Sequence, residues 1–264
     1  MPSDSTPSIG EVIGWQLKDQ VARLRINRPD KRNALATRHW AVLESCLQEI
    51  HASTAKLLLL EGIPGVFSAG ADIAELGELL MKPHAFAASN AQVQRTQLAL
   101  QRSPLTTIAV IDGACVGGGL GLALACDFRI GTARSRFALS PAKLGLVYSP
   151  EDSRRLVNTV GLARAREMLL TGRLLDAPAA LQWGLLNWLV ADGGLDDLVV
   201  TMVAELQQTS AGARAGIKQV LAYLGGDDRM DHAAATAAFN DAFSSADFAE
   251  GARAFLAKRP PRFH

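Results

Sequence analysis

The chain has 264 residues, of which 48% are hydrophobic and 20% charged, and its formal net charge is +1. This length allows one substantial globular domain with a helical extension, and the near-neutral charge excludes the broad basic surface of a nucleic-acid-binding protein. No basic stretch followed by an apolar run opens the chain, and no apolar stretch reaches about 18 residues, so we expect neither a secretory signal nor a membrane span.

The cysteines and histidines indicate a reducing compartment and no metal site. Cys46, Cys115 and Cys126 lie far apart and form no CxxC pair, which is typical of small core residues in a cytoplasmic protein. No two of the five histidines have the spacing of metal ligands. We therefore predict a cytoplasmic location and no bound metal.

The first 140 residues alternate apolar strands with amphipathic helices. Pro83 is expected to break the chain between two helices, and Arg28-Pro29-Asp30 to close the first strand. Alternating strands and helices favour βαβ units and a mainly parallel sheet. The predicted strands are 21–27, 56–61, 107–112, 128–131 and 136–139, and the predicted helices are 36–51, 72–80, 85–102 and 120–126.

After Pro150 the pattern becomes almost purely helical. A short strand at 185–190 is the one interruption. We therefore divide the chain into an α/β core, residues 1–195, and a C-terminal helical region, residues 196–264. The predicted helices are 150–159, 161–171, 176–183, 195–208, 211–224, 231–245 and 247–257.

Two glycine-rich turns, FSAGADI (67–73) and GACVGGGLG (113–121), each join a predicted strand to a predicted helix. A helix N-terminus has unpaired N–H groups that suit an anion, and two such turns could aim two N–H groups at one oxygen, forming an oxyanion hole. The second turn lacks the lysine and hydroxyl residue of a P-loop, and its glycines do not form GxGxxG. Close packing of helix on strand is the structural alternative for these glycines.

Four segments in order resemble the signature blocks of the crotonase (enoyl-CoA hydratase/isomerase) family. They are NRPDKRNAL (27–35), FSAGADIAEL (67–76), IDGACVGGGLGLALACDFRI (111–130) and EGARAFLAKRPP (250–261), and the resemblance spans residues 21–263. It implies an α/β fold, a superhelix of ββα turns with a C-terminal helical trimerisation region, and hence a homotrimer or a dimer of trimers. It also implies an acyl-CoA thioester substrate, with coenzyme A as part of that substrate and no separate cofactor.

The resemblance also implies the roles of individual residues. By position, the backbone N–H groups of Ala71 and Gly118 match the donors that hold the thioester oxygen. The coenzyme A moiety would follow Arg32, Ala34 and the first glycine turn. The predicted substrate-binding residues are Arg32, Ala34, Ser68, Ala69, Gly70, Asp72, Ile73, Gly117, Gly121 and Pro141.

This sequence departs from the hydratases at their catalytic carboxylates, which add water to the double bond by general acid–base catalysis. The two glutamate positions match Gly121 and Pro141, and the carboxylate position of the family's isomerases matches Ser149. Gly121 either leaves space for a branched or carboxylated acyl group or packs tightly against a neighbouring strand. Glu151 and Asp152 are the nearest substitutes, although the SPED segment (149–152) is also a typical helix start with a capping serine.

The segment 137–148 is similar to the same region of methylmalonyl-CoA decarboxylases, which also lack these glutamates and have a tyrosine matching Tyr148, but which have a histidine where Ala71 stands. Loss of CO2 needs no base, because the leaving group supplies the electrons, and it benefits from an enolate sink without acidic neighbours. We therefore expect a lyase that decarboxylates an acyl-CoA, in which Tyr148 binds the carboxylate or delivers a proton.

Two other functions fit the same motifs. One is an enoyl-CoA hydratase or isomerase that uses Glu151 or Asp152 as its carboxylate. The other is a non-catalytic protein that binds acyl-CoA. The motifs for the oxyanion hole are common to all three and do not separate them.

Overall fold

The computed structural model describes residues 12–79 and 81–263. The N-terminal segment, for which no secretory signal is expected, lies outside the described residues. The described residues form two compact units, one within residues 12–103 and 107–196 and the other within residues 104–106 and 197–263. Within the described residues, no helix has both the length and the apolar character that crossing a bilayer requires.

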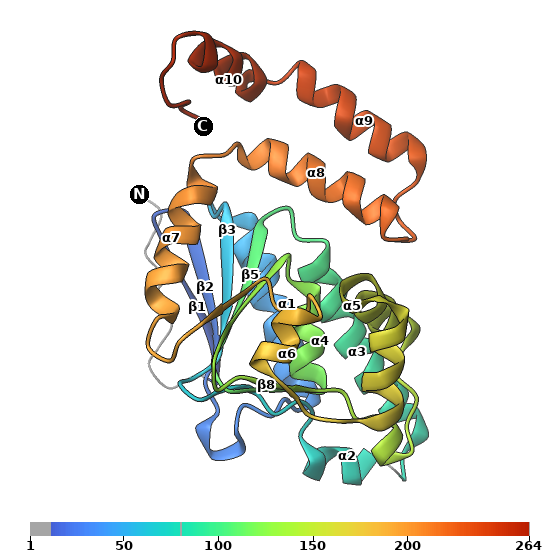
Figure 1. Cartoon of the computed structure of the whole chain (residues 1–264). Coiled ribbons are helices and arrows are strands. Elements are labelled where there is room, and N and C mark those ends of the chain that lie inside the picture. Colours follow the sequence, from blue (N-terminus) through green and yellow to red (C-terminus); the bar gives the residue numbers. More distant parts are fainter. Residues whose placement is uncertain (1–11, 80, 264) are drawn as a thin grey trace. The chain divides into compact units, whose positions relative to one another are not determined.

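A six-stranded sheet forms the centre of the first unit (Figure 1). β2 pairs with β3, and β7 pairs with both β5 and β10, in parallel, whereas the edge strand β1 is antiparallel to β2. Every residue of β3 and β5 is buried, which explains their continuous apolar sequences. The strands in sheet order are β1 (Ile13–Lys18), β2 (Val21–Ile26), β3 (Leu57–Glu61), β5 (Thr106–Ile111), β7 (Phe128–Thr132) and β10 (Trp188–Val190).

The second, four-stranded sheet consists of very short strands in the order β4 (Val66–Ser68), β6 (Ala114–Val116), β8 (Arg136–Ala138) and β9 (Leu175–Asp176). β4 and β6 pair in parallel. Each of them runs directly into one of the glycine-rich turns. Because parallel neighbours end at the same edge of a sheet, this pairing brings the two turns together.

The helices of the first unit agree with the expected pattern apart from two starting points and one junction: the predicted helices 150–159 and 161–171 form one element, Pro150–Thr171, with non-helical backbone at Gly161. Pro83 is the first residue of α3 rather than a break before it, because proline fits the first helical turn. α4 begins at Gly118, two residues earlier than predicted, so Gly117 is its N-cap and Gly118 and Gly119 lie in its first turn. The helices are α1 (Thr37–Ala52), α2 (Ile73–Leu79), α3 (Pro83–Gln101), α4 (Gly118–Ala125), α5 (Pro150–Thr171) and α6 (Ala177–Gln182), with 3-10 turns at Pro29–Lys31 and Ala142–Leu144.

The second unit is helical, as the sequence predicted. Its helices begin with capping side chains: Ser210, Asp231 and Ser245 each accept a hydrogen bond from a backbone N–H in the first turn. α8 and α9 pack against each other. The helices are α7 (Leu195–Gln207), which begins just before this unit, α8 (Ala211–Leu224), α9 (His232–Phe243) and α10 (Ala246–Leu256).

Candidate functional site

The first glycine turn follows β4 and is held against the chain after β2. Leu35 N donates to Gly70 O at 2.8 Å, and Asp72 N donates to Leu35 O at 3.1 Å. Ala71 lies between these two bonds, and among the described residues none accepts a hydrogen bond from its N–H. Ala71 is exposed, so this donor is open to a ligand.

The second glycine turn follows β6 and opens α4. Gly117 has a positive φ of 53° and caps the helix, while its N–H donates to Ala138 O at 2.9 Å. The first helical bond runs from Gly121 N to Gly117 O. The N–H of Gly118 therefore has no hydrogen-bond acceptor within the helix, as is true of all first-turn N–H groups. Gly118 is half-buried.

The two turns approach each other so closely that only glycine fits. A Cβ on Gly70 would lie 2.9 Å from Val116 O and 3.2 Å from Gly118 N, and φ at Gly70 is +89°. An L-residue there would meet both a steric clash and backbone strain. The turn that contains Ala71 thus lies against the backbone of Gly118, so the two N–H groups belong to adjoining turns. Such a pair can stabilise the negative charge that develops on one carbonyl oxygen.

Trp40 of α1 closes the space beside this donor pair. A Cβ on Gly118 would lie 2.9 Å from Cζ2 of the indole ring. The tryptophan is 2% exposed, and its backbone carbonyl accepts a hydrogen bond from Thr96 Oγ1 at 2.9 Å. In the sequence, Trp40 is one apolar position of the predicted helix 36–51, and no motif marks it as part of a site.

The space expected at Gly121 is filled. A Cβ on Gly121 would lie 2.3 Å from Gln97 Nε2 and 3.4 Å from Asp152 Oδ1. The expectation of room for a branched acyl group is therefore wrong for this conformation. The packing alternative is correct, although the neighbours are side chains of α3 and α5 rather than a strand. The carboxylate of Asp152 therefore lies beside position 121.

Asp152 and Arg155 form a buried ion pair in the first turns of α5. Their side chains are 6% and 5% exposed, and Arg155 Nη2 donates to Asp152 Oδ1 at 2.9 Å. Asp152 Oδ2 accepts hydrogen bonds from Gln94 Nε2 at 2.8 Å and Ser149 Oγ at 2.9 Å. A carboxylate offers about four acceptor positions, so one remains on Oδ1.

Arg155 links this carboxylate to α3. Its Nη2 also donates to Gln97 Oε1 at 2.5 Å, and its Nη1 donates to Gln101 Oε1 at 3.0 Å. Burial lowers the pKa of Arg155, whereas the charge of Asp152 raises it. We name the side chains of Gln94, Gln97, Gln101, Asp152 and Arg155 the α3–α5 polar cluster.

The start of α5 has the capping chemistry predicted from its sequence. Ser149 is the N-cap, Pro150 is the first helical residue, and Ser149 Oγ accepts a hydrogen bond from Asp152 N at 3.0 Å. Glu151 is half-buried in the same turn, where its charge suits the helix dipole. A catalytic role for Glu151 stays a prediction.

Tyr148 lies beside the polar cluster. Its hydroxyl is buried, and no described residue pairs with it. Burial raises the pKa of Tyr148 well above its usual range, and the nearby charge of Asp152 adds to that rise. The phenol therefore stays protonated at neutral pH, so it can donate a hydrogen bond but cannot act as a base.

Ser68 and Asp72 shape the first turn. The Ser68 hydroxyl is buried, donates to Asn33 O at 2.8 Å and accepts from Gly70 N at 3.1 Å. Asp72 pairs with Arg28 at 2.7 Å, and this hydrogen bond lowers the pKa of the carboxyl group. Contact of either side chain with coenzyme A stays a prediction.

The other predicted binding residues lie around the same turns. Ala69 N donates to Arg32 O at 2.9 Å, which brings the chain after β2 against the first turn. Arg32 and Ile73 are exposed, whereas Ala34 is buried. Pro141 precedes the 3-10 turn at Ala142–Leu144.

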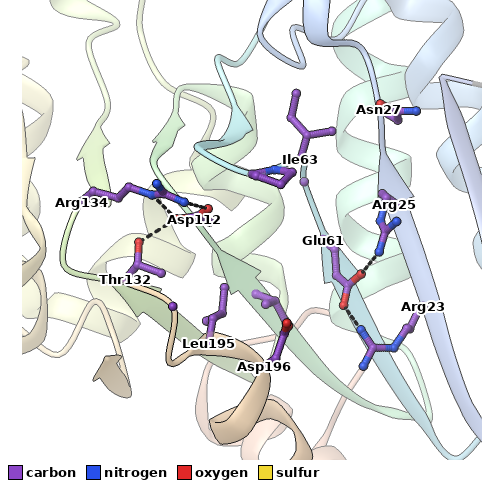
Figure 2. A pocket seen from close by; sticks show the side chains of 14 residues that line it. Arg23, Arg25, Asn27, Glu61, Ile63, Asp112, Thr132, Arg134, Leu195 and Asp196 are labelled. Carbon is purple, nitrogen blue, oxygen red and sulfur yellow. Dashed lines mark hydrogen bonds and ion pairs between the residues drawn. The ribbon is translucent and has the colours of Figure 1, made fainter. Parts of the chain in front are cut away.

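A separate cavity of about 550 Å³ contains none of the predicted site residues. Figure 2 shows Glu61 between Arg23 and Arg25 on one side, and Asp112 with Arg134 on the other. The guanidinium groups that line it are thus already paired with carboxylates. The cavity adds nothing to the site at the glycine turns.

Comparisons with known proteins agree with the motifs. The family model described as enoyl-CoA hydratase/isomerase matches residues 16–264. The chain is 31% identical over 90% of its length to an enoyl-CoA isomerase/hydratase of Penicillium crustosum, and it spans 28% of that protein.

Two solved structures superpose on nearly the whole chain. A protein from Hyphomonas neptunium does so with a TM-score of 0.92 and 34% identity, over 98% of this chain and 99% of that one. An enoyl-CoA hydratase/carnithine racemase from Magnetospirillum magneticum has a TM-score of 0.89 and 30% identity, over 96% of each chain.

Proposed function

Because the chain belongs to the enoyl-CoA hydratase/isomerase family, we propose that it binds an acyl-CoA thioester and stabilises the enolate of that thioester. The thioester oxygen accepts hydrogen bonds from Ala71 N–H and Gly118 N–H. The observation that carries this proposal is the contact between the two glycine turns, in which Gly70 and Gly118 touch. Fixed donors aimed at the developing charge stabilise an enolate more than the ground state.

The reaction that the site supports best is hydration or isomerisation of an enoyl-CoA. Relatives named for both reactions support it. Gly121, Pro141 and Ser149 have no carboxylate, but Asp152 places one beside Gly121. In hydration, Asp152 takes a proton from water as the water oxygen bonds to C3, the electrons pass to the thioester oxygen, and C2 is then protonated.

The motifs support further parts of this function. The coenzyme A moiety lies along Arg32, Ala34 and residues 68–73. The second unit supports assembly into trimers, because apolar side chains remain exposed on α9 and α10: Phe239, Phe243, Phe248, Phe255 and Leu256. Light scattering at micromolar concentration tests the assembly, and a monomer would contradict it.

Loss of CO2 from a carboxylated acyl-CoA is the second candidate function. The observation that favours it is the Tyr148 hydroxyl, which is buried without a described partner and is therefore free to donate to a substrate carboxylate. In that reaction the C–C bond to the carboxylate breaks, its electron pair passes to the thioester oxygen, and a proton is then added at C2.

A panel of CoA thioesters, followed by mass spectrometry, separates these functions. Gain of water or a shift of the double bond in an enoyl-CoA supports the first, and loss of CO2 from methylmalonyl-CoA supports the second. Asp152→Asn then abolishes turnover by the first route, whereas Glu151→Gln retains it. Turnover that survives Asp152→Asn would reject the role of Asp152, and failure of any CoA ester to bind would reject the whole proposal.

A further inference from the structure

The amide of Gln97 has a defined orientation. Arg155 Nη2 donates to its Oε1 at 2.5 Å, and because a guanidinium group only donates, this end of the amide must be the oxygen. The opposite end, Nε2, lies 2.3 Å from the position of a Cβ on Gly121. Among the described residues, none accepts a hydrogen bond from this nitrogen. The site thus contains an oriented amide donor without a protein acceptor.

This donor lies next to the proposed oxyanion hole. Gly121 is three residues after Gly118 in α4, so the two occupy the same side of the helix, about 4.5 Å apart along its axis. The Cα–Cβ direction in a helix leans toward the N-terminus, so the side-chain position of Gly121 leans back toward the turn of Gly118. Gln97 Nε2 occupies that position.

The absence of a side chain at position 121 is what admits this donor. Gln97 is 1% exposed and fixed by Arg155, which is itself fixed by Asp152. Arg155 is therefore a positioning residue for Gln97, and the Gln97 amide is the group that faces the ligand.

We propose that Gln97 Nε2 binds an oxygen on C3 of the acyl group, so that the preferred ligands are acyl-CoA thioesters with an oxygen function at C3. The inference rests on the proposed function, which places the C1 oxygen at Ala71 and Gly118. With C1 held there, C3 is two bonds further along the chain. A hydrocarbon acyl group would leave the amide donor unpaired when it excludes water, which is costly. The 3-oxo, 3-hydroxy and malonyl-type acyl groups all share the required acceptor.

Titration calorimetry with matched CoA esters tests the proposal. Butyryl-CoA has no oxygen at C3, whereas acetoacetyl-CoA, 3-hydroxybutyryl-CoA and malonyl-CoA carry a ketone, a hydroxyl and a carboxylate there. The wild-type protein is expected to bind acetoacetyl-CoA about tenfold more tightly than butyryl-CoA, the usual size for one hydrogen bond to a buried donor. The other two esters show which oxygen function is preferred.

Two variants assign the preference to Gln97. Gln97→Glu keeps the acceptor for Arg155 and replaces the donor, and Gln97→Met keeps the length and removes both polar ends. In each variant, the affinity for acetoacetyl-CoA is expected to fall to that for butyryl-CoA. The affinity for butyryl-CoA is expected to stay within about twofold of the wild-type value. Gln101→Glu makes the same chemical change at another partner of Arg155, away from Gly121, and is expected to keep the preference.

The outcomes separate this inference from the proposed function. Equal affinity of the wild-type protein for acetoacetyl-CoA and butyryl-CoA would overturn the inference alone, because the esters would still bind. A preference that survives in both Gln97 variants would also overturn it. Absence of binding by every CoA ester would instead overturn the proposed function.

Discussion

Gly121→Ala should destabilise the wild-type protein but stabilise a variant that lacks the Gln97 amide. Alanine in a helix interior is about 1 kcal/mol more favourable than glycine, and Gly121 has no positive φ that would oppose it. The new Cβ, however, lies 2.3 Å from Gln97 Nε2. The amide must then move, although Arg155 and the surrounding side chains hold it.

The contacts of Gln97 set the magnitude. Overpacking of a filled interior costs about 1–3 kcal/mol, and loss of the bond from Arg155 to Gln97 Oε1 costs about 1.5–3 kcal/mol, because one partner is charged. After subtraction of the helix-propensity gain, Gly121→Ala should lower the free energy of unfolding by about 1.5–5 kcal/mol. In a Gln97→Ala background the clash is absent, and Gly121→Ala should raise the free energy of unfolding by about 1 kcal/mol.

Urea denaturation of the four proteins in this double-mutant cycle measures the coupling. The expected sign change of the Gly121→Ala effect between the two backgrounds is the decisive result. An identical effect in both backgrounds, within about 0.5 kcal/mol, would refute the contact between position 121 and the Gln97 amide.

Three further predictions concern other groups. Gly70→Ala should destabilise the protein by more than about 2 kcal/mol, since it combines positive-φ strain with overpacking. It should also abolish thioester binding, because the new Cβ displaces Gly118 N. Thioester binding that is retained in calorimetry would contradict the proposed donors. Tyr148→Phe should leave the free energy of unfolding unchanged or raise it by about 1 kcal/mol, because it removes a buried hydroxyl that has no described partner; a marked loss would reveal a missed hydrogen bond. The Glu250 carboxyl should titrate with a pKa of about 2 because Arg259 donates to it. Its contribution to stability is therefore complete above about pH 4.5 and is lost as the pH falls toward 2. Carboxyl-carbon NMR of Arg259→Ala should show the pKa returning toward 4.5.

The sequence predicts the parts of the fold whose patterns are long or strongly periodic. The buried strands β3 and β5 are continuous apolar runs, and α1 and α8 repeat apolar positions at helical spacing. The family resemblance, carried by four separate blocks, predicts the architecture as a whole and is confirmed by the match to the family model.

The arrangement around Gly121 could not be predicted in the same way. β4 and β6, which align the two glycine turns, have three residues each and no periodicity to detect. Gln97 and Arg155 look like ordinary polar positions of amphipathic helices. Their contact depends on how α3 packs against α5 across α4, and this packing is decided by tertiary contacts rather than by local propensity.

Both donors that we propose for the thioester oxygen belong to the main chain, at Ala71 and Gly118. Every residue except proline supplies that N–H, so side-chain substitutions that leave the two glycine turns in place also leave the proposed electron sink in place. We expect the identity of the reaction to be set by a different part of the molecule, the side chains of α3 and α5. An engineer who wishes to convert one acyl-CoA reaction into another can therefore vary Gln97, Asp152 and their neighbours while the step common to all of them is inherited unchanged from the backbone.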